Sequence, residues 1–320
     1  MVKPDNRFNM LKVIKLIIIL LVTISFADAQ QKPGALIERL LKLTPDSKWT
    51  QTAAIPLKFD AHHTQGMVKI GEYFFMTSVE VSRWPKKYEK PQDGLDRDTG
   101  IGKGHVFKFD AQGNLLADLP IGSVDIYHPG GIDFDGTYIW IPVTEYRPKS
   151  FSVIYKLNPK TMELTEVVRI KESIGAIVHN LQNNTLTGAN WGARKFYTWQ
   201  LDKSGKVTKG NLPPEKPARE NPSFYVDFQD CKYLGNGLML GSGLSSYKND
   251  AGTFRLGGWE IFSLNDFRPV RQVPIKLWSP TGAPMCNNPS TVEATTDGLR
   301  AYFVPDDDEK AVLFVYEVSH

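Results

Sequence analysis

Residues 128–143 read HPGGIDFDGTYIWIPV, and this stretch decides the fold. A polar residue opens a short run, Asp135-Gly136 predicts a tight turn, and 138–143 returns as a strand of aromatic and β-branched residues. Two more β-type runs follow at 152–157 and 164–170. Together these runs predict one four-stranded antiparallel unit.

The same unit recurs along the chain, and we count five copies. They open on a polar residue at His63, His128, Ser173, Asp227 and Ser290. The second strands are expected at 73–79, 138–143, 185–189, 237–241 and 301–304. Because no long helical pattern separates the strands, the repeat predicts an all-β propeller with five blades. A two-sheet sandwich is the alternative.

The last copy ends after its third strand, at 312–318. Residues 49–59 precede the first copy and can supply the missing fourth strand. That pairing would remove an open sheet edge. We therefore expect a β-propeller domain over 49–320, closed by an N-terminal strand.

The first 29 residues have the features of a signal peptide. Lys12 and Lys15 precede an apolar run at 16–24, and Ala27-Asp28-Ala29 follows it. The run is shorter than the roughly 20 residues that a membrane span needs. We expect cleavage after Ala29, a short N-terminal segment over 30–48, and a secreted or periplasmic protein without a membrane span after cleavage.

Composition limits the partners. The net charge is only +3, from 38 basic and 35 acidic residues, so a nucleic-acid partner is not expected. Nothing in the sequence demands an oligomer, and we expect a monomer. Cys231 and Cys286 can form one disulfide in an oxidising compartment, or remain as two buried thiols.

The openings of the modules bring chemistry-bearing residues to one end of the propeller axis. His63, His128 and Asp227 occupy equivalent positions there, and imidazole and carboxylate groups suit a divalent metal in the axial channel. The two imidazoles can equally serve as general acid and base. Further ligand contacts are expected from residues just inside the channel: Gln229, Asp230 and Glu293. A hydrated channel without a ligand is the alternative.

Loops of successive blades repeat a second pattern, in which Arg or Lys stands near an aromatic residue. Examples are Arg83-Trp84, Tyr146-Arg147 and Trp191 with Arg194. Arg recognises carboxylates and phosphates, whereas aromatic rings stack on sugars. The recurrence predicts binding of an anionic small molecule or acidic glycan. The last blade instead carries an acidic cluster, Asp306-Asp307-Asp308-Glu309, which is a calcium candidate or a solvated turn.

Two classes of function fit these residues: an enzyme, either a lyase or a hydrolase, and a non-catalytic binding scaffold. A lyase needs a base, an acid and a cation, and these types are present in His63, His128, Tyr146, Arg147 and Arg194. A hydrolase would use two facing carboxylates among Asp227, Asp230 and Glu293. A non-catalytic binding scaffold would use the same face for recognition only.

Three segments carry a resemblance to known proteins: HHTQG at 62–66, HPGGID at 128–133 and FQDC at 228–231. They resemble an uncharacterised family of exported bacterial β-propeller proteins, over most of the mature chain. The blade pattern is more distantly similar to gluconolactonase, paraoxonase and strictosidine-synthase-like propellers. That likeness implies six blades and an axial calcium site of Glu, Asn and Asp, but those ligands do not map onto this sequence residue by residue.

Overall fold

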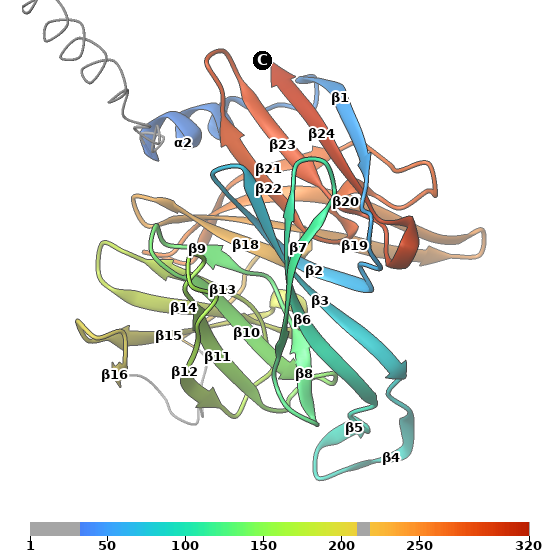
Figure 1. Cartoon of the computed structure of the whole chain (residues 1–320), viewed down its shortest axis with the longest axis vertical. Coiled ribbons are helices and arrows are strands. Elements are labelled where there is room, and N and C mark those ends of the chain that lie inside the picture. Colours follow the sequence, from blue (N-terminus) through green and yellow to red (C-terminus); the bar gives the residue numbers. More distant parts are fainter. Residues whose placement is uncertain (1–32, 210–217, 320) are drawn as a thin grey trace, which may run out of the picture. The chain divides into compact units, whose positions relative to one another are not determined.

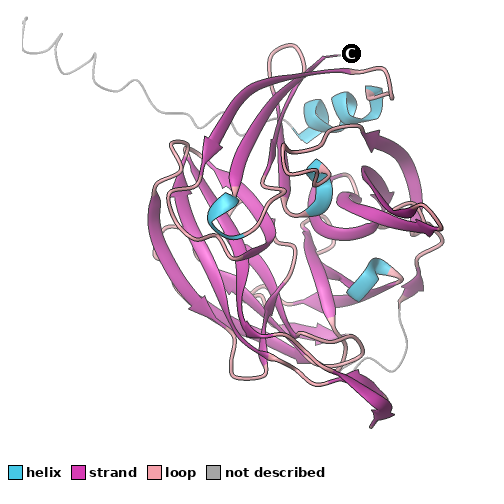
Figure 2. Ribbon diagram, turned by 90° about the vertical axis from the view of Figure 1, so that its right-hand side faces the viewer, coloured by secondary structure: helices cyan, strands magenta, loops and turns pink. Residues whose placement is uncertain are grey.

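The computed structural model describes residues 33–209 and 218–319. The predicted signal peptide, residues 1–29, lies outside this part of the chain. The described residues begin with helix α2 (Pro33–Lys42), and strands dominate the remainder (Figure 2). Among these residues, no helix has the length and apolar content required to span a membrane.

Five antiparallel sheets form a five-bladed β-propeller, as the repeat predicts. Blade 1 is β2 (His63–Ile70), β3 (Tyr73–Arg83), β6 (Ile101–Asp110) and β7 (Leu115–Ile121). Blade 2 is β8 (Ile126–Pro129) with β9 (Asp133–Phe134), β10 (Ile139–Glu145), β11 (Ser152–Leu157) and β12 (Leu164–Ile170). Blade 3 is β13 (Ile174–Asn180), β14 (Thr185–Asn190), β15 (Lys195–Leu201), β16 (Val207–Lys209) and β17 (Arg219–Glu220).

Blade 4 is β18 (Asp227–Gly235), β19 (Leu238–Asn249), β20 (Gly252–Ser263) and β21 (Arg268–Ile275). Blade 5 joins β22 (Ser290–Ala294), β23 (Leu299–Phe303) and β24 (Val312–Ser319) to β1 (Lys48–Pro56). A separate hairpin, β4 (Lys87–Gln92) and β5 (Leu95–Arg97), lies within the connection from β3 to β6.

The predicted closure of the ring is confirmed. β1 pairs antiparallel with β24, from Trp49 opposite Val318 to Pro56 opposite Val312 (Figure 1). The Trp49 ring meets Trp259 edge to face, at 5.5 Å between ring centroids. Blade 5 is thus assembled from both ends of the described chain, and β1 covers an edge of β24 that would otherwise be open.

Backbone contacts fill the centre of the propeller, where we expected a channel. The Gly131 amide donates to the Gly175 carbonyl oxygen at 2.8 Å, and Gly131 and Ala176 form an isolated parallel β-bridge. A Cβ on Gly131 would lie 2.6 Å from the Asp230 Cα, and one on Gly66 would lie 2.7 Å from the Ile132 nitrogen. The inner strands of blades 1 to 4 therefore touch at this level, and only glycine permits so close an approach.

Three inner strands share a β-bulge near their first residues. The extra residues are Gln65 in β2, Gly175 in β13 and Gln229 in β18, each without a partner in the register of its blade. A bulge bends a strand and redirects its side chains, and bulges are frequent beside functional sites. Here the bulges occupy the same end of the propeller as His63 and His128.

Apolar residues fill the spaces between neighbouring blades. Helix α2 contributes Ile37 and Leu40 to a cluster with Trp259 and Phe303 of blades 4 and 5. Cys231 and Cys286 are both buried and free, so the thiol alternative holds and the disulfide does not form. Burial raises the pKa of both thiols.

Candidate functional site

One end of the axis carries a cluster of five rings from three blades: His63, Trp84, His128, Tyr146 and Trp191. We call it the axial ring cluster. The ring centroids of His63 and His128 are 6.3 Å apart, and Trp84 lies 6.5 Å from His63. His63 and His128 each stand three residues before a glycine of the closed centre, Gly66 and Gly131. The predicted proximity of the two histidines is therefore present.

His128 lies within a stack of aromatic rings. Its imidazole stacks on Tyr146 at 4.0 Å and on Trp191 at 5.5 Å between centroids, with 25° between the ring planes in both pairs. Burial, with a smaller effect of His63, lowers the pKa of His128 from 6.5 to about 3. Its buried Nε2 has no hydrogen-bond partner among the described residues. His128 is therefore a neutral imidazole at physiological pH, with one nitrogen left for a ligand or a water molecule.

A carboxylate from blade 5 orients His63. Nδ1 of His63 lies 3.0 Å from Oδ2 of Asp307. The other oxygen of Asp307 accepts hydrogen bonds from Asn288 Nδ2 at 2.7 Å and from the Thr64 amide at 3.3 Å. A carboxylate held in this way favours the His63 tautomer with hydrogen on Nδ1, which leaves Nε2 as the basic nitrogen.

Loops after second strands supply the remaining rings. Trp84 follows the end of β3, where an ion pair of 2.8 Å between Arg83 and Asp98 holds the base of the loop. Trp84 is 60% exposed and is the most exposed ring of the cluster. Trp191 opens a short 3-10 helix in which Gly192 has a φ of 75°. Tyr146 follows β10, and burial raises its pKa to about 12, so its hydroxyl stays protonated.

The two predicted arginines lie in ion pairs. Nε of Arg147 is 2.5 Å from Oε2 of Glu145, and Nη1 also donates to the Arg97 carbonyl oxygen. Arg194 pairs with Asp227 at 3.1 Å and donates to backbone oxygens of Gly192 and Ser223. Each guanidinium thus faces a carboxylate of the chain. Asp227, predicted as a metal ligand together with His63 and His128, forms an ion pair with Arg194. The carboxylate that contacts His63 belongs to Asp307 instead.

Two of the predicted ligand-binding carboxylates have other partners. Asp230 is buried and accepts hydrogen bonds from the amides of Met67, Ile132 and Cys231, while Lys232 Nζ lies 2.5 Å away. Burial raises the pKa of Asp230 to about 6. Glu293 forms an ion pair with Lys69 at 3.0 Å. Lys69 lies six residues beyond His63 on β2, so the two residues are about 20 Å apart along the strand. Asp230 therefore joins blades 1, 2 and 4, and Glu293 lies away from the ring cluster.

Gln229 stands at the bulge of β18 and is partly exposed. Its counterpart Gln65 is buried, and Nε2 of Gln65 has no hydrogen-bond partner among the described residues. Neither Gln65 nor Asp307 is among the predicted catalytic, ligand-binding or metal residues, although the module alignment places Gln65 just inside the predicted channel. The signal for Asp307 was the acidic run at 306–309, which looks like a solvated turn until the ring closes.

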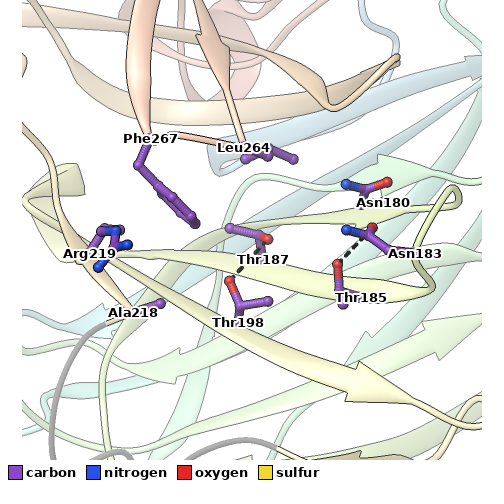
Figure 3. A pocket seen from close by; sticks show the side chains of 9 residues that line it. All are labelled: Asn180, Asn183, Thr185, Thr187, Thr198, Ala218, Arg219, Leu264 and Phe267. Atoms are coloured by element: carbon purple, nitrogen blue, oxygen red, sulfur yellow. Dashed lines mark hydrogen bonds between the residues drawn. The ribbon is translucent and has the colours of Figure 1, made fainter.

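A pocket of about 280 Å³ lies elsewhere, between blades 3 and 4. Thr187 and Thr198 line one side, and Phe267 and Leu264 face them (Figure 3). Among the described residues that line it, Arg219 is the only ionisable one. The pocket is near the end of β13, away from the axial ring cluster, and lacks the acid–base groups that the cluster has.

The fold is similar to several solved structures. Similar solved structures include a luciferin-regenerating enzyme (8% identity, TM-score 0.42, covering 85% of this chain and 96% of that one). The WD40 domain of Toxoplasma gondii coronin has 9% identity and a TM-score of 0.40, covering 87% of both chains. The tail fibre of Staphylococcus aureus phage P68 has 10% identity and a TM-score of 0.45, covering 89% of this chain and 56% of the other. With TM-scores below 0.5, these likenesses carry no argument, and the fold rests on the strand pairing described above.

No curated protein matches the sequence. A family model does match it, over residues 18–320. The chain belongs to the family of unknown function DUF6454.

Proposed function

We propose that the axial ring cluster binds a small carbohydrate-type ligand, and that the protein does so after export. The observation that carries this proposal is the convergence of Trp84, Tyr146 and Trp191 around two histidines. Flat aromatic faces stack on sugar rings, and an exposed Trp is a frequent anchor at binding sites. His63 Nε2 and His128 Nε2 would provide the polar contacts that fix the orientation of the ligand.

The ligand's charge is a finer part of the proposal. Arg97 and Arg147 lie beside Tyr146, but they already face Asp96 and Glu145. A carboxylated sugar would have to share these guanidinium groups with the protein's own carboxylates. The geometry supports stacking more strongly than charge recognition, and the acidic glycan is one arm of the test.

Acid–base chemistry at this site would be a β-elimination. His63, oriented by Asp307, would take the proton next to the substrate carboxylate, a C=C bond would form, and the C–O bond to the leaving group would break. The protonated Tyr146 hydroxyl would supply the proton to the leaving oxygen. A two-carboxylate hydrolase has less support, because Asp230 is saturated by backbone amides and Glu293 lies near the other end of β2.

Calorimetric titration with neutral and uronate-containing oligosaccharides tests the binding. Trp84→Ala should weaken binding by roughly 5- to 150-fold, if stacking of the ligand on this ring is worth about 1–3 kcal/mol, the range found for nucleic-acid bases. Tyr73→Ala is the matched control, because Tyr73 is also exposed but lies at the turn between β2 and β3, away from His63. Equal losses in both variants, or no binding of any sugar by the wild-type chain, would contradict the proposal.

The scaffold alternative predicts binding without turnover. Ultraviolet absorbance of a new C=C bond conjugated to a carboxylate would report the elimination. His63→Ala should abolish that signal and should weaken binding less than Trp84→Ala does, because the aromatic rings remain. Binding that persists with no product from any uronate substrate would favour the scaffold. Mass spectrometry of the exported protein checks the location, with Gln30 expected as the first residue.

A further inference from the structure

A second cluster of ligand-type side chains lies beside the axial ring cluster but points elsewhere. One nitrogen of His62, one nitrogen of His105 and one oxygen of Glu80 all lie within 4.8 Å of one another. His62 directly precedes β2, Glu80 belongs to β3 and His105 belongs to β6. His105 stands opposite Ser78, two residues from Glu80, so both side chains project from the same face of blade 1.

The His105 imidazole is built as a metal ligand usually is. Its Nδ1 lies 2.9 Å from Oδ1 of Asp118 on β7. Its side chain is only 9% exposed, yet Nε2 has no hydrogen-bond partner among the described residues and lies 3.8 Å from Oε2 of Glu80. Buried polar nitrogens normally have a partner, and metal-binding histidines normally donate their second N–H to a carboxylate. A metal ion at Nε2 would supply the partner that this buried nitrogen lacks, and Asp118 already accepts from Nδ1 as a carboxylate does beside a metal-binding histidine.

The backbone holds His62 in an unusual conformation. Its φ is 51°, which non-glycine residues adopt rarely and often at functional sites. The His62 amide donates to Asp60 Oδ1 at 2.9 Å, and the His62 carbonyl oxygen accepts from the Asp308 amide at 2.8 Å. Nδ1 of His62 lies 3.2 Å from Oδ1 of Asp60, so this imidazole also has a carboxylate beside it.

Charge favours a cation at this point. Carboxylates of Asp60, Glu80, Asp118 and Asp308 surround the two imidazoles. The neighbouring cation is Lys103, whose Nζ lies 3.4 Å from Glu80 Oε2 and whose side chain is 70% exposed. A metal ion would replace this exposed ammonium group at little cost, because an exposed ion pair contributes about 0–1 kcal/mol.

We propose that His62, Glu80 and His105 bind one divalent transition-metal ion of the zinc class. Two imidazole nitrogens and one carboxylate oxygen form a donor set of this class, and three protein ligands leave a position open for water or a substrate. Bonds of about 2.0–2.1 Å place tetrahedral ligands roughly 3.3 Å apart, so the three atoms would close by rotation of their side chains. The site is independent of the proposed sugar binding, which uses His63 and not His62.

Zinc titration of the purified, chelator-treated chain tests this site, with Co²⁺ absorption as a report of coordination. The wild-type chain should bind one ion, and Zn²⁺ should raise its Tm. Glu80→Gln and His62→Asn should each abolish stoichiometric binding; Asn tolerates the positive φ of position 62. Asp118→Asn should weaken binding by about 10–100-fold, because it removes only the partner of a ligand. His63→Gln is the matched control and should bind the ion as the wild-type chain does.

The competing arrangement is a protonated His105 between Asp118 and Glu80, without a metal. It predicts no visible absorption bands with Co²⁺ and no rise in Tm with Zn²⁺. It also predicts that Glu80→Gln lowers the Tm relative to the wild-type chain by the same amount with and without zinc. Those results, or zinc binding that survives both Glu80→Gln and His62→Asn, would overturn the proposal. Circular dichroism of each variant confirms that loss of binding is not loss of fold.

Discussion

Nδ1 of His63 lies 3.0 Å from Oδ2 of Asp307, and this contact joins the inner strand of blade 1 to the loop before the last strand of blade 5. The two residues are 244 positions apart in the chain. The orientation of the His63 imidazole therefore depends on the placement of blade 5 beside blade 1, at the point where the ring closes.

Replacing Asp307 by Asn should lower the free energy of unfolding by about 1–2 kcal/mol. The variant loses a charged acceptor that serves His63, Asn288 and the Thr64 amide. Urea denaturation at neutral pH measures the change. Asp250→Asn, at an exposed turn, is the control and should change stability little. An Asp307→Asn protein as stable as the wild type would mean that this contact does not stabilise the packing of blade 1 against blade 5.

His128 should make the protein less stable in acid. Its folded pKa is about 3 against an ordinary 6.5, so the folded chain binds fewer protons than the unfolded chain between these values. Stability contributed by the neutral imidazole is complete above pH ~6.5 and falls as the pH falls toward ~3. At pH 4.5 the loss should be about 2–3 kcal/mol.

Comparison of the wild-type chain with His128→Gln isolates this effect. Buried Asp133 and Asp230, whose pKa values burial raises to about 6, act in the opposite direction, but they are present in both proteins. The difference in unfolding free energy between pH 7 and pH 4.5 should be smaller in the variant. An identical difference would show that His128 accepts a proton as readily in the folded chain as in the unfolded one.

Gly131→Ala should destabilise the protein by about 3 kcal/mol or prevent folding. The added Cβ would meet the Asp230 Cα at 2.6 Å and the Gln229 carbonyl oxygen at 2.7 Å, and neither backbone atom can move alone. Gly34→Ala is the matched control, because nothing lies within 4 Å of that position in helix α2. Thermal unfolding of both variants measures the contrast. A Gly131→Ala protein as stable as the wild type would show that the centre is wider than described.

Asp230→Asn should cost about 3 kcal/mol at pH 7. An amide cannot accept from three backbone N–H groups and also neutralise Lys232, whose largely buried ammonium would keep only the carbonyl oxygens of Ile132 and Cys231 as partners. Denaturant unfolding with Asp297→Asn, an exposed residue, as control measures the loss. A neutral or stabilising effect would mean that the desolvation of the Asp230 carboxylate destabilises the fold at least as much as its hydrogen bonds and its ion pair stabilise it.

The blade pattern was open to prediction because its signals are local. Turn dipeptides such as Asp135-Gly136 and runs such as 138–143 specify strands and turns from neighbouring residues alone. Alignment of the modules then placed His63 and His128 at one end of the axis, and the rings of Tyr146 and Trp191 lie there too. The export signal and the identity of the ligand stay predictions.

Other features depend on pairings between distant residues. The partner of Arg194 could not be read from its loop, because Asp227 lies 33 residues further along the chain and meets the guanidinium only in the folded geometry. Glu145, by contrast, stands only two residues before Arg147. Closure of the axis follows from glycines of different blades meeting at one point, which no single module reveals. The role proposed for His62 could not be read from the sequence either, because its imidazole lies near Glu80 and His105 only once β2, β3 and β6 are paired, and its φ of 51° is set by the folded backbone.

The pairing of β1 with β24 also sets an order of events during synthesis. Pro56 and Val312 are partners, yet about 250 residues separate them in the chain. At ribosomal rates of about 5–20 residues per second, β1 waits roughly 10–50 s for its partner. Blades 1 to 4 have all their strands before the fifth can be completed. The first β-strand to be made is thus among the last to be paired, and until then it is a free segment that a chaperone or another nascent chain can bind.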